Sequence, residues 1–100
     1  MGKEKDDFEA KFEFDGKDAS AVYDKNGKRK AFEIAIYKSE FPTPIEEYLK
    51  KKYPKSKVLE TAKITDDKNV VTFEAEIKID GKPTDVIFDA KGTFIKTSQD

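Results

Sequence analysis

Two pairs of glutamates offer the most direct route to catalysis in this sequence. Glu46 with Glu47, and Glu74 with Glu76, could divide general-acid and general-base roles if their environments set their pKa values apart. The chain contains no His and no Cys, which excludes a histidine triad, a histidine metal site and a thiolate nucleophile. A first helical turn and a solvated strand face explain the two pairs more simply, and we predict that the protein is not an enzyme.

Three other short stretches have the residue types of ligand sites. The stretch Asp24-Lys25-Asn26-Gly27 has part of a calcium-loop pattern, but the loop also needs an acidic residue at Val22 and a later Glu, so we predict a turn. Asp66-Asp67 could hold a cation loosely, and Lys50-Lys51-Lys52 could hold an anion. Turn chemistry and a helix C-terminus account for both, and no metal or cofactor is predicted.

The composition describes one small folded domain. The chain has 100 residues, 12 of them aromatic, which is enough for a core. Lys plus Arg (20) nearly balances Asp plus Glu (21), so we predict no nucleic-acid binding. No apolar run is long enough to span a bilayer, and residues 1–7 lack the apolar core of a signal peptide, so we predict no membrane insertion.

The sequence contains one convincing helix, over residues 43–53, ended by Pro54. We expect Thr43 to be its N-cap, Pro44 to take the first helical position and Glu46 to complete a capping box. A single apolar face runs along this helix, formed by Ile45, Leu49 and Tyr53. This face requires a sheet to cover it, and we expect it to pack around Phe73, Ile77 and Phe88.

The rest of the chain alternates apolar and polar residues, as half-buried strands do. The predicted strands cover residues 8–14, 19–24, 30–38, 57–65, 70–79, 84–89 and about 93–97. In the fourth of these strands we expect Val58, Ala62 and Ile64 to share one face. The predicted fold class is α+β: an antiparallel meander of about seven strands with one helix on one face, in the order βββ-α-ββββ.

An internal repeat organises this single domain, residues 1–100. Residues 8–28 align without a gap on residues 73–93, and eight of the twenty-one positions are identical, among them Asp15/Asp80, Gly16/Gly81 and Gly27/Gly92. We interpret 8–38 as a partial first repeat of three strands and 43–97 as a complete second repeat of one helix and four strands. The first repeat has no helix of its own.

Several motifs resemble the PepSY-like, β-lactamase-inhibitor-like (BLIP-like) family of bacterial secreted proteins. They are Phe41-Pro42-x-Pro44-Ile45, Tyr53-Pro54, Asp80-Gly81-Lys82 and Phe88-Asp89-x-x-Gly92. The family architecture is a helix with an antiparallel meander, given twice, and here the first helix and strand are missing. The resemblance implies a periplasmic or secreted, non-catalytic module that binds a protein partner through the sheet face away from the helices, for example as a peptidase or lactamase inhibitor.

Two surfaces are candidates for binding. Apolar residues predicted to point away from the helix could form a protein interface: Val22, Ala35, Tyr37, Ile87 and Ile95. The uncovered first strand could instead drive self-association, as a homodimer or a domain-swapped assembly, through Phe8, Phe12 and Phe14. A truncated or designed scaffold with no natural ligand is the alternative that the sequence leaves open.

Overall fold

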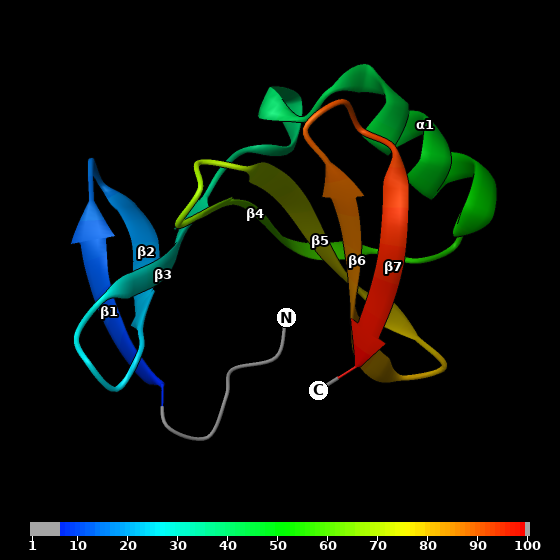
Figure 1. The fold of residues 1–100 in the computed structure, drawn as a ribbon. Coiled ribbons are helices and arrows are strands. Elements are labelled where there is room, and N and C mark those ends of the chain that lie inside the picture. The colour runs from blue at the N-terminus through cyan, green and yellow to red at the C-terminus, as the bar shows by residue number, and fades with distance from the viewer. Residues whose placement is uncertain (1–6, 100) are drawn as a thin grey trace.

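A computed structural model describes residues 7–99 as one antiparallel sheet with a helix on one face (Figure 1). The seven strands lie side by side in chain order, and the helix enters between the third and the fourth. The strands are β1 (Phe8–Phe14), β2 (Lys17–Tyr23), β3 (Arg29–Ala35), β4 (Val58–Asp66), β5 (Val71–Ile79), β6 (Lys82–Asp89) and β7 (Phe94–Gln99). This order confirms the predicted fold class. Residues 1–6, where no signal peptide is predicted, lie outside the described part.

The two hairpins aligned by the repeat turn in the same way. Asp15 and Asp80 both have φ 52°, and Gly16 and Gly81 have φ 75° and 79°. Positive φ at both central residues is the type I′ pattern, which Asp-Gly tolerates and which matches the twist of paired strands. The predicted Asp-Gly turns are therefore present in β1–β2 and β5–β6.

Three further turns use an aspartate side chain as the anchor. The Oδ1 atom of Asp24 accepts the backbone N–H groups of Asn26 (2.9 Å) and Lys28 (3.0 Å). Asp66 and Asp89 each accept two backbone N–H groups at the same sequence spacing. The N–H of Lys28 is the main cause that lowers the pKa of Asp24. These carboxylates are bound to their own backbone, as the turn interpretation of residues 24–27 and 66–67 requires.

The helix α1 (Thr43–Lys52) begins differently from the sequence-based expectation. Pro42 is the N-cap residue, Thr43 is the first helical residue, and no side chain caps the helix start. The capping-box prediction with Thr43 is therefore wrong, because Thr43 is already inside the helix, whereas an N-cap residue has non-helical backbone angles. The N–H of Ile45 bonds to the Pro42 carbonyl at 3.0 Å and closes the first turn. The helix ends as expected, with Tyr53 as the C-cap before Pro54.

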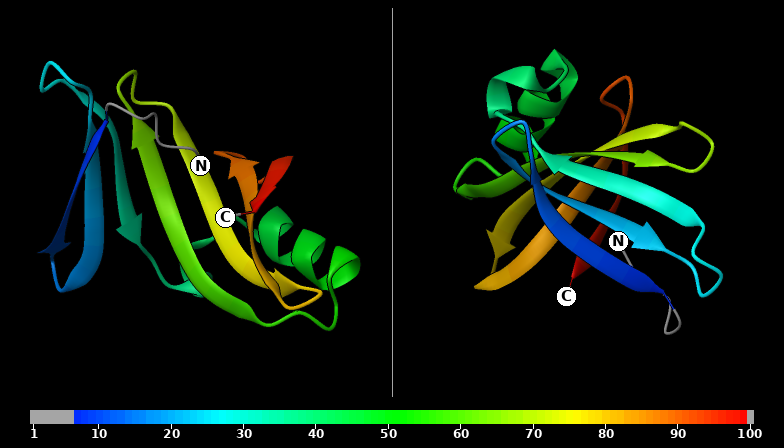
Figure 2. Two further views of the ribbon diagram at one scale, coloured as in Figure 1. Left: turned by 90° about the horizontal axis from the view of Figure 1, so that it is seen from below. Right: turned by 90° about the vertical axis from the view of Figure 1, so that its left-hand side faces the viewer.

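The helix lies over β5, β6 and β7 on the convex side of a strongly curved sheet (Figure 2). The core between them is apolar and buried, and it consists of Phe41, Ile45, Leu49, Phe73, Ala75, Ile77, Val86 and Phe88. Tyr48 stacks on Phe94 of β7, with ring centroids 5.0 Å apart. The expected packing of the helix on Phe73, Ile77 and Phe88 is confirmed. No helix among residues 7–99 is long and apolar enough to cross a membrane.

A β-bulge in β4 divides its apolar residues between the two faces. The register with β5 shifts between Val58 and Glu60, so that Val58 pairs with Ile77 while Ala62 pairs with Glu74. Val58 packs on the helix-side core, whereas Ala62 and Ile64 line the opposite face. The expectation that these three residues share a face is therefore wrong, because one extra residue in a strand reverses the side-chain alternation beyond it.

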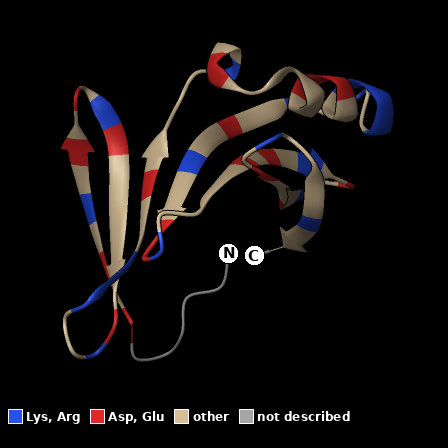
Figure 3. Ribbon diagram, turned by 45° about the horizontal axis from the view of Figure 1, so that its top comes forward, with Lys and Arg blue, Asp and Glu red and all other residues tan. Residues whose placement is uncertain are grey.

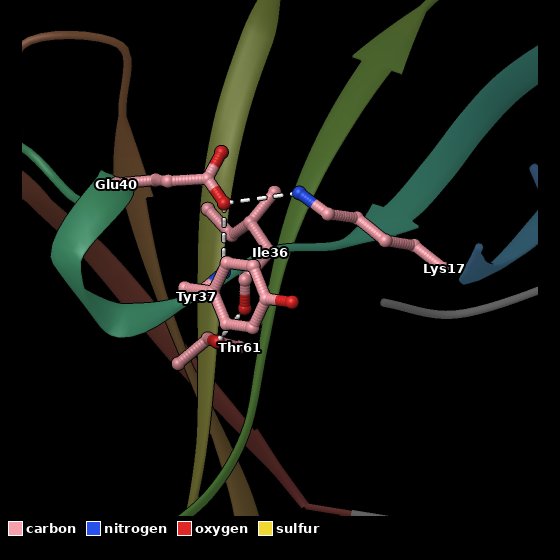
Figure 4. Close-up of polar contacts among 5 residues, drawn as sticks. All are labelled: Lys17, Ile36, Tyr37, Glu40 and Thr61. Carbon is pink, nitrogen blue, oxygen red and sulfur yellow. Dashed lines mark hydrogen bonds and ion pairs between the residues drawn. The ribbon is translucent and has the colours of Figure 1, made fainter. Parts of the chain in front are cut away.

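A polar corner ends β3 earlier than predicted and turns the chain toward the helix (Figure 4). A short 3₁₀ helix, η1 (Lys38–Glu40), follows β3, and the Glu40 carboxylate accepts the N–H of Tyr37 and the ammonium of Lys17, both at 3.0 Å. The Tyr37 N–H is the first cause, and Lys17 the second, that lower the pKa of Glu40. The hydroxyl of Thr61 donates to the Ile36 carbonyl. These bonds tie the three-stranded half to the segment that leads into α1.

Candidate protein-binding groove

The concave face of the sheet, opposite α1, forms an open groove of about 1320 Å³. The bend that separates β1–β3 from β6–β7 is visible from two directions (Figures 1 and 3). The groove floor follows from the register, because residues directly opposite in neighbouring strands point to the same face. One row across the floor runs from Ser20 to Glu33, Ile64 and Thr72. A second row runs from Ala35 to Ala62, Glu74 and Ile87.

Three carboxyl groups interact with one another on the floor of this groove. Glu74 of β5 forms side-chain hydrogen bonds with Glu33 of β3 and Asp85 of β6. Burial is the first cause that raises the pKa of Glu74 to about 8, followed by the Asp85 hydrogen bond and the negative charge of Glu33. Burial also raises the pKa of Glu33. The raised pKa of Glu74 means that the cluster retains a proton at neutral pH.

Charge is distributed unevenly over the molecule despite the near balance in composition. The described residues that line the groove include nine acidic side chains and two basic ones, Lys11 and Lys30. Three lysines instead end α1 on the far side of the sheet, and all three are exposed (Figure 3). The groove therefore attracts positively charged groups more strongly than the rest of the surface does.

The two pairs of glutamates considered for catalysis lie in different parts of the structure. Glu46 and Glu47 belong to the first turns of α1, as expected. Glu74 and Glu76 both line the groove, and Glu74 is partly buried, so its interpretation as part of a solvated strand face is wrong. Within residues 7–99, no group of three or more acidic side chains could hold a metal ion. The arrangement is suited to binding cationic groups.

The structure places the five predicted interface residues in three different surroundings. Val22 and Ala35 line the groove. Ile87 lies on the same sheet face, opposite Glu74, but it is only 6% exposed. Tyr37 is 68% exposed beside Lys17, and Ile95 is 48% exposed at the register shift of β7. Two of the five predicted interface residues, Val22 and Ala35, therefore lie in the groove.

Sequence reasoning missed the carboxyl cluster. Alternation correctly placed Glu33 and Glu74 on the face away from the helix, but their contact depends on β3, β4, β5 and β6 being adjacent and in register. The predicted meander order implies that these strands are neighbours in the sheet, and this was the signal that could have placed Glu33 and Glu74 close together. Asp85 was hidden within Thr84-Asp85-Val86-Ile87, where five consecutive residues, 84–88, are buried.

The predicted self-association residues all lie on the edge strand β1. Phe8, Phe12 and Phe14 are 64%, 41% and 49% exposed. They lie on the helix side of the sheet, since Phe12 pairs with Ala19, Ala19 with Ile34, and the same row leads through Lys63 to Phe73. Phe32 of β3 packs against Phe12 and Phe14 at ring-centroid distances of 6.0 and 5.9 Å. The helix does not extend over this region.

Solved structures share this curved antiparallel meander backed by a helix. A DUF2874 family protein from Bacteroides uniformis superposes with a TM-score of 0.82 and 14% identity, over 98% of this chain and 74% of that one. A predicted periplasmic protein from Bacteroides eggerthii gives 0.82 and 11% identity, over 98% and 73%.

A BLIP-like protein from Bacteroides fragilis superposes with a TM-score of 0.74 and 15% identity, over 98% of this chain and 71% of that one. No protein-family model matches the sequence, and no match is found among curated proteins. At these identities the likeness establishes the fold alone. The chain therefore has the fold shared by BLIP-like and DUF2874 proteins.

Proposed function

We propose that this chain is a non-catalytic protein-binding domain that uses the concave groove to hold a basic segment of a partner protein. The observation that carries the proposal is the groove itself, an uncovered sheet face that combines apolar floor residues with an excess of carboxylates. Apolar area supplies most of the binding free energy, while charge complementarity supplies orientation and rate of association. A partner surface that presents Lys or Arg around an apolar centre fits both requirements.

The comparisons support this proposal at the level of architecture. One structural neighbour is a BLIP-like protein and another is a predicted periplasmic protein. We therefore place the proposed activity in the periplasm or outside the cell, and we propose inhibition of a partner enzyme as its most specific form. Inhibition requires only that the partner's basic segment lie beside its own active site.

The test compares two arginine substitutions that differ only in location. Ala35→Arg puts bulk and positive charge inside the groove, whereas Ala90→Arg puts the same side chain on an exposed turn. Immobilised wild type and both variants are exposed to periplasmic extract from Bacteroides, and captured proteins are identified and assayed for inhibition as purified enzymes. Capture that survives Ala90→Arg but is lost with Ala35→Arg supports the proposal. Equal capture by the two folded variants would eliminate the groove as the binding site.

A further inference from the structure

The free edge of β1 differs from the free edge of β7 in what covers its apolar side chains. On β7, Phe94 stacks on Tyr48 of the helix and meets Phe88 edge-on at 6.3 Å. On β1, all seven residues are exposed, and among the described residues the ring contacts of its phenylalanines are those of Phe12 and Phe14 with Phe32. An exposed apolar strand with an unpaired backbone edge favours pairing with another strand. The edge of β1 is therefore the better place for a strand to add to the sheet.

The charges of β1 identify the partner strand. By alternation, β1 has Glu9, Lys11 and Glu13 on the groove face and Phe8, Ala10, Phe12 and Phe14 on the other face. The charges alternate in sign along the strand (Figure 3). In an antiparallel pair of two identical strands centred on Ala10, Glu9 of each copy lies opposite Lys11 of the other. Glu13 lies opposite Asp7, whose carboxylate is paired with Lys30 at 2.9 Å. The same register places Phe8 of each copy opposite Phe12 of the other. Opposite charges and aromatic pairs directly across two strands both stabilise a sheet.

The backbone of β1 can form this pairing without losing its bonds to β2. Phe14 and Lys17 flank the two-residue turn and are therefore a hydrogen-bonded pair. Hydrogen-bonded and non-hydrogen-bonded pairs alternate along an antiparallel ladder, so the even-numbered residues of β1 direct their N–H and C=O groups toward β2. The odd-numbered residues 9, 11 and 13 direct theirs away from the sheet. A two-fold axis at Ala10 then brings residues 9 and 11 of the two copies into hydrogen-bonded pairs.

We propose that the chain forms a symmetric homodimer in which the β1 strands of two copies pair antiparallel and join the two sheets into one. A two-fold contact uses both edges equally and therefore closes, unlike a contact between β1 and β7, which would continue into a filament. The paired surface is one seven-residue strand with its aromatic row, which is at the small end of specific interfaces. We expect a dissociation constant on the order of micromolar.

An exchange of charges on β1 tests whether this strand is the contact surface and whether a second copy of the chain binds there. The Lys11→Glu variant presents three negative charges to its own copy, and the Glu9→Lys/Glu13→Lys variant presents three positive charges. We expect each variant alone to weaken the dimer by at least about tenfold in sedimentation equilibrium, and an equimolar mixture to restore a heterodimer. Two monomeric variants that remain monomeric when mixed would overturn the proposal, as would a wild-type chain that stays monomeric at several hundred micromolar or grows into filaments.

A backbone variant provides the second line of evidence. Lys11→Pro removes an outward-facing N–H from the edge, where proline is tolerated, so β1–β2 pairing should persist while the dimer is lost. Lys11→Ala is its matched control because it removes the charge and keeps the N–H. The groove variant Ala35→Arg should leave the dimer unchanged, so that this proposal and the proposed function can fail separately. Dimerisation that survives Lys11→Pro would refute pairing through the β1 edge.

Discussion

The two halves of the sheet use related hairpin sequences in different surroundings. Every residue of β1 is exposed, while Phe73, Ala75 and Ile77 of its counterpart β5 are buried. The hairpin turns have the same conformation, and the aligned residues have similar types, so local sequence does not cause the difference. The difference comes from position in the fold, because β5 lies between two strands and under the helix, whereas β1 is an edge strand that the helix does not cover. Burial of a hairpin is thus a property of its neighbours.

The largest expected difference between the halves is the cost of truncating an apolar side chain. Ile45 is 0% exposed under the helix, and Ile45→Ala should lower the free energy of unfolding by about 3 kcal/mol because it leaves a cavity. Phe12 is 41% exposed, and Phe12→Ala should cost about 1 kcal/mol although more atoms are removed. Urea unfolding at low micromolar concentration measures both. Equal costs would contradict the distinction between a covered and an uncovered half.

The aligned glycines Gly27 and Gly92 offer a closer comparison. Both have positive φ, 83° and 91°, so an alanine at either position is strained by about 1 kcal/mol. A Cβ on Gly92 would also lie 3.1 Å from the Cβ of Pro44 and 3.3 Å from that of Pro42, whereas none of these contacts exists at Gly27. We expect Gly92→Ala to cost about 2 to 3 kcal/mol and Gly27→Ala about 1 kcal/mol in thermal unfolding. If the two variants melt alike, the turn at Gly92 does not support the helix.

The carboxyl cluster makes stability depend on pH. The pKa of Glu74 is raised from 4.5 to about 8 on folding, so its contribution is complete below about pH 4.5 and is lost as the pH rises through 8. Because Glu74 is partly exposed, we expect a loss of only about 1 to 2 kcal/mol over this range. Glu74→Gln should remove most of this slope in urea titrations, while Glu47→Gln on the exposed helix surface should keep it. If Glu74→Gln keeps the wild-type dependence of stability on pH, Glu74 is not the cause of that dependence.

The smallest effect is expected at the start of the helix. No side chain caps α1, and the turn around Gly92 packs against Pro42 and Pro44 instead. Thr43→Ala should therefore change the free energy of unfolding by less than about 0.5 kcal/mol, whereas a true N-cap threonine would cost about 1 kcal/mol or more. A melting-temperature comparison with wild type decides between the two. A loss of about 1 kcal/mol or more in the free energy of unfolding would mean that Thr43 does act as the N-cap.

Alternation and turn residues predicted all seven strands and the helix, because Asp-Gly and Asp-x-x-Gly turns determine where strands reverse independently of the rest of the chain. Local pattern failed where the physical cause is not local. The bulge in β4 depends on how Val58 and Ala62 pair with β5, and the helix start depends on a turn fifty residues away in sequence.

The groove was predictable as a sheet face but not as a charged site. The pattern placed Val22 and Ala35 there, yet the cluster of Glu33, Glu74 and Asp85 forms only when four strands, β3 to β6, are in register. The burial of Ile87 was also missed. Alternation places this residue on the open face of the sheet, and the curvature of the sheet then covers it.

The anchored turns at Asp24 and Asp89 also determine where a chemical handle can be attached. They share the same hydrogen bonds, but only the second touches the helix, through Gly92. A fluorophore, an affinity tag or an inserted peptide at Asn26 therefore extends into solvent, whereas a side chain added at Gly92 would displace Pro42 and Pro44 at the start of α1. Two loops of equal shape thus offer the experimenter one usable attachment point and one to leave intact.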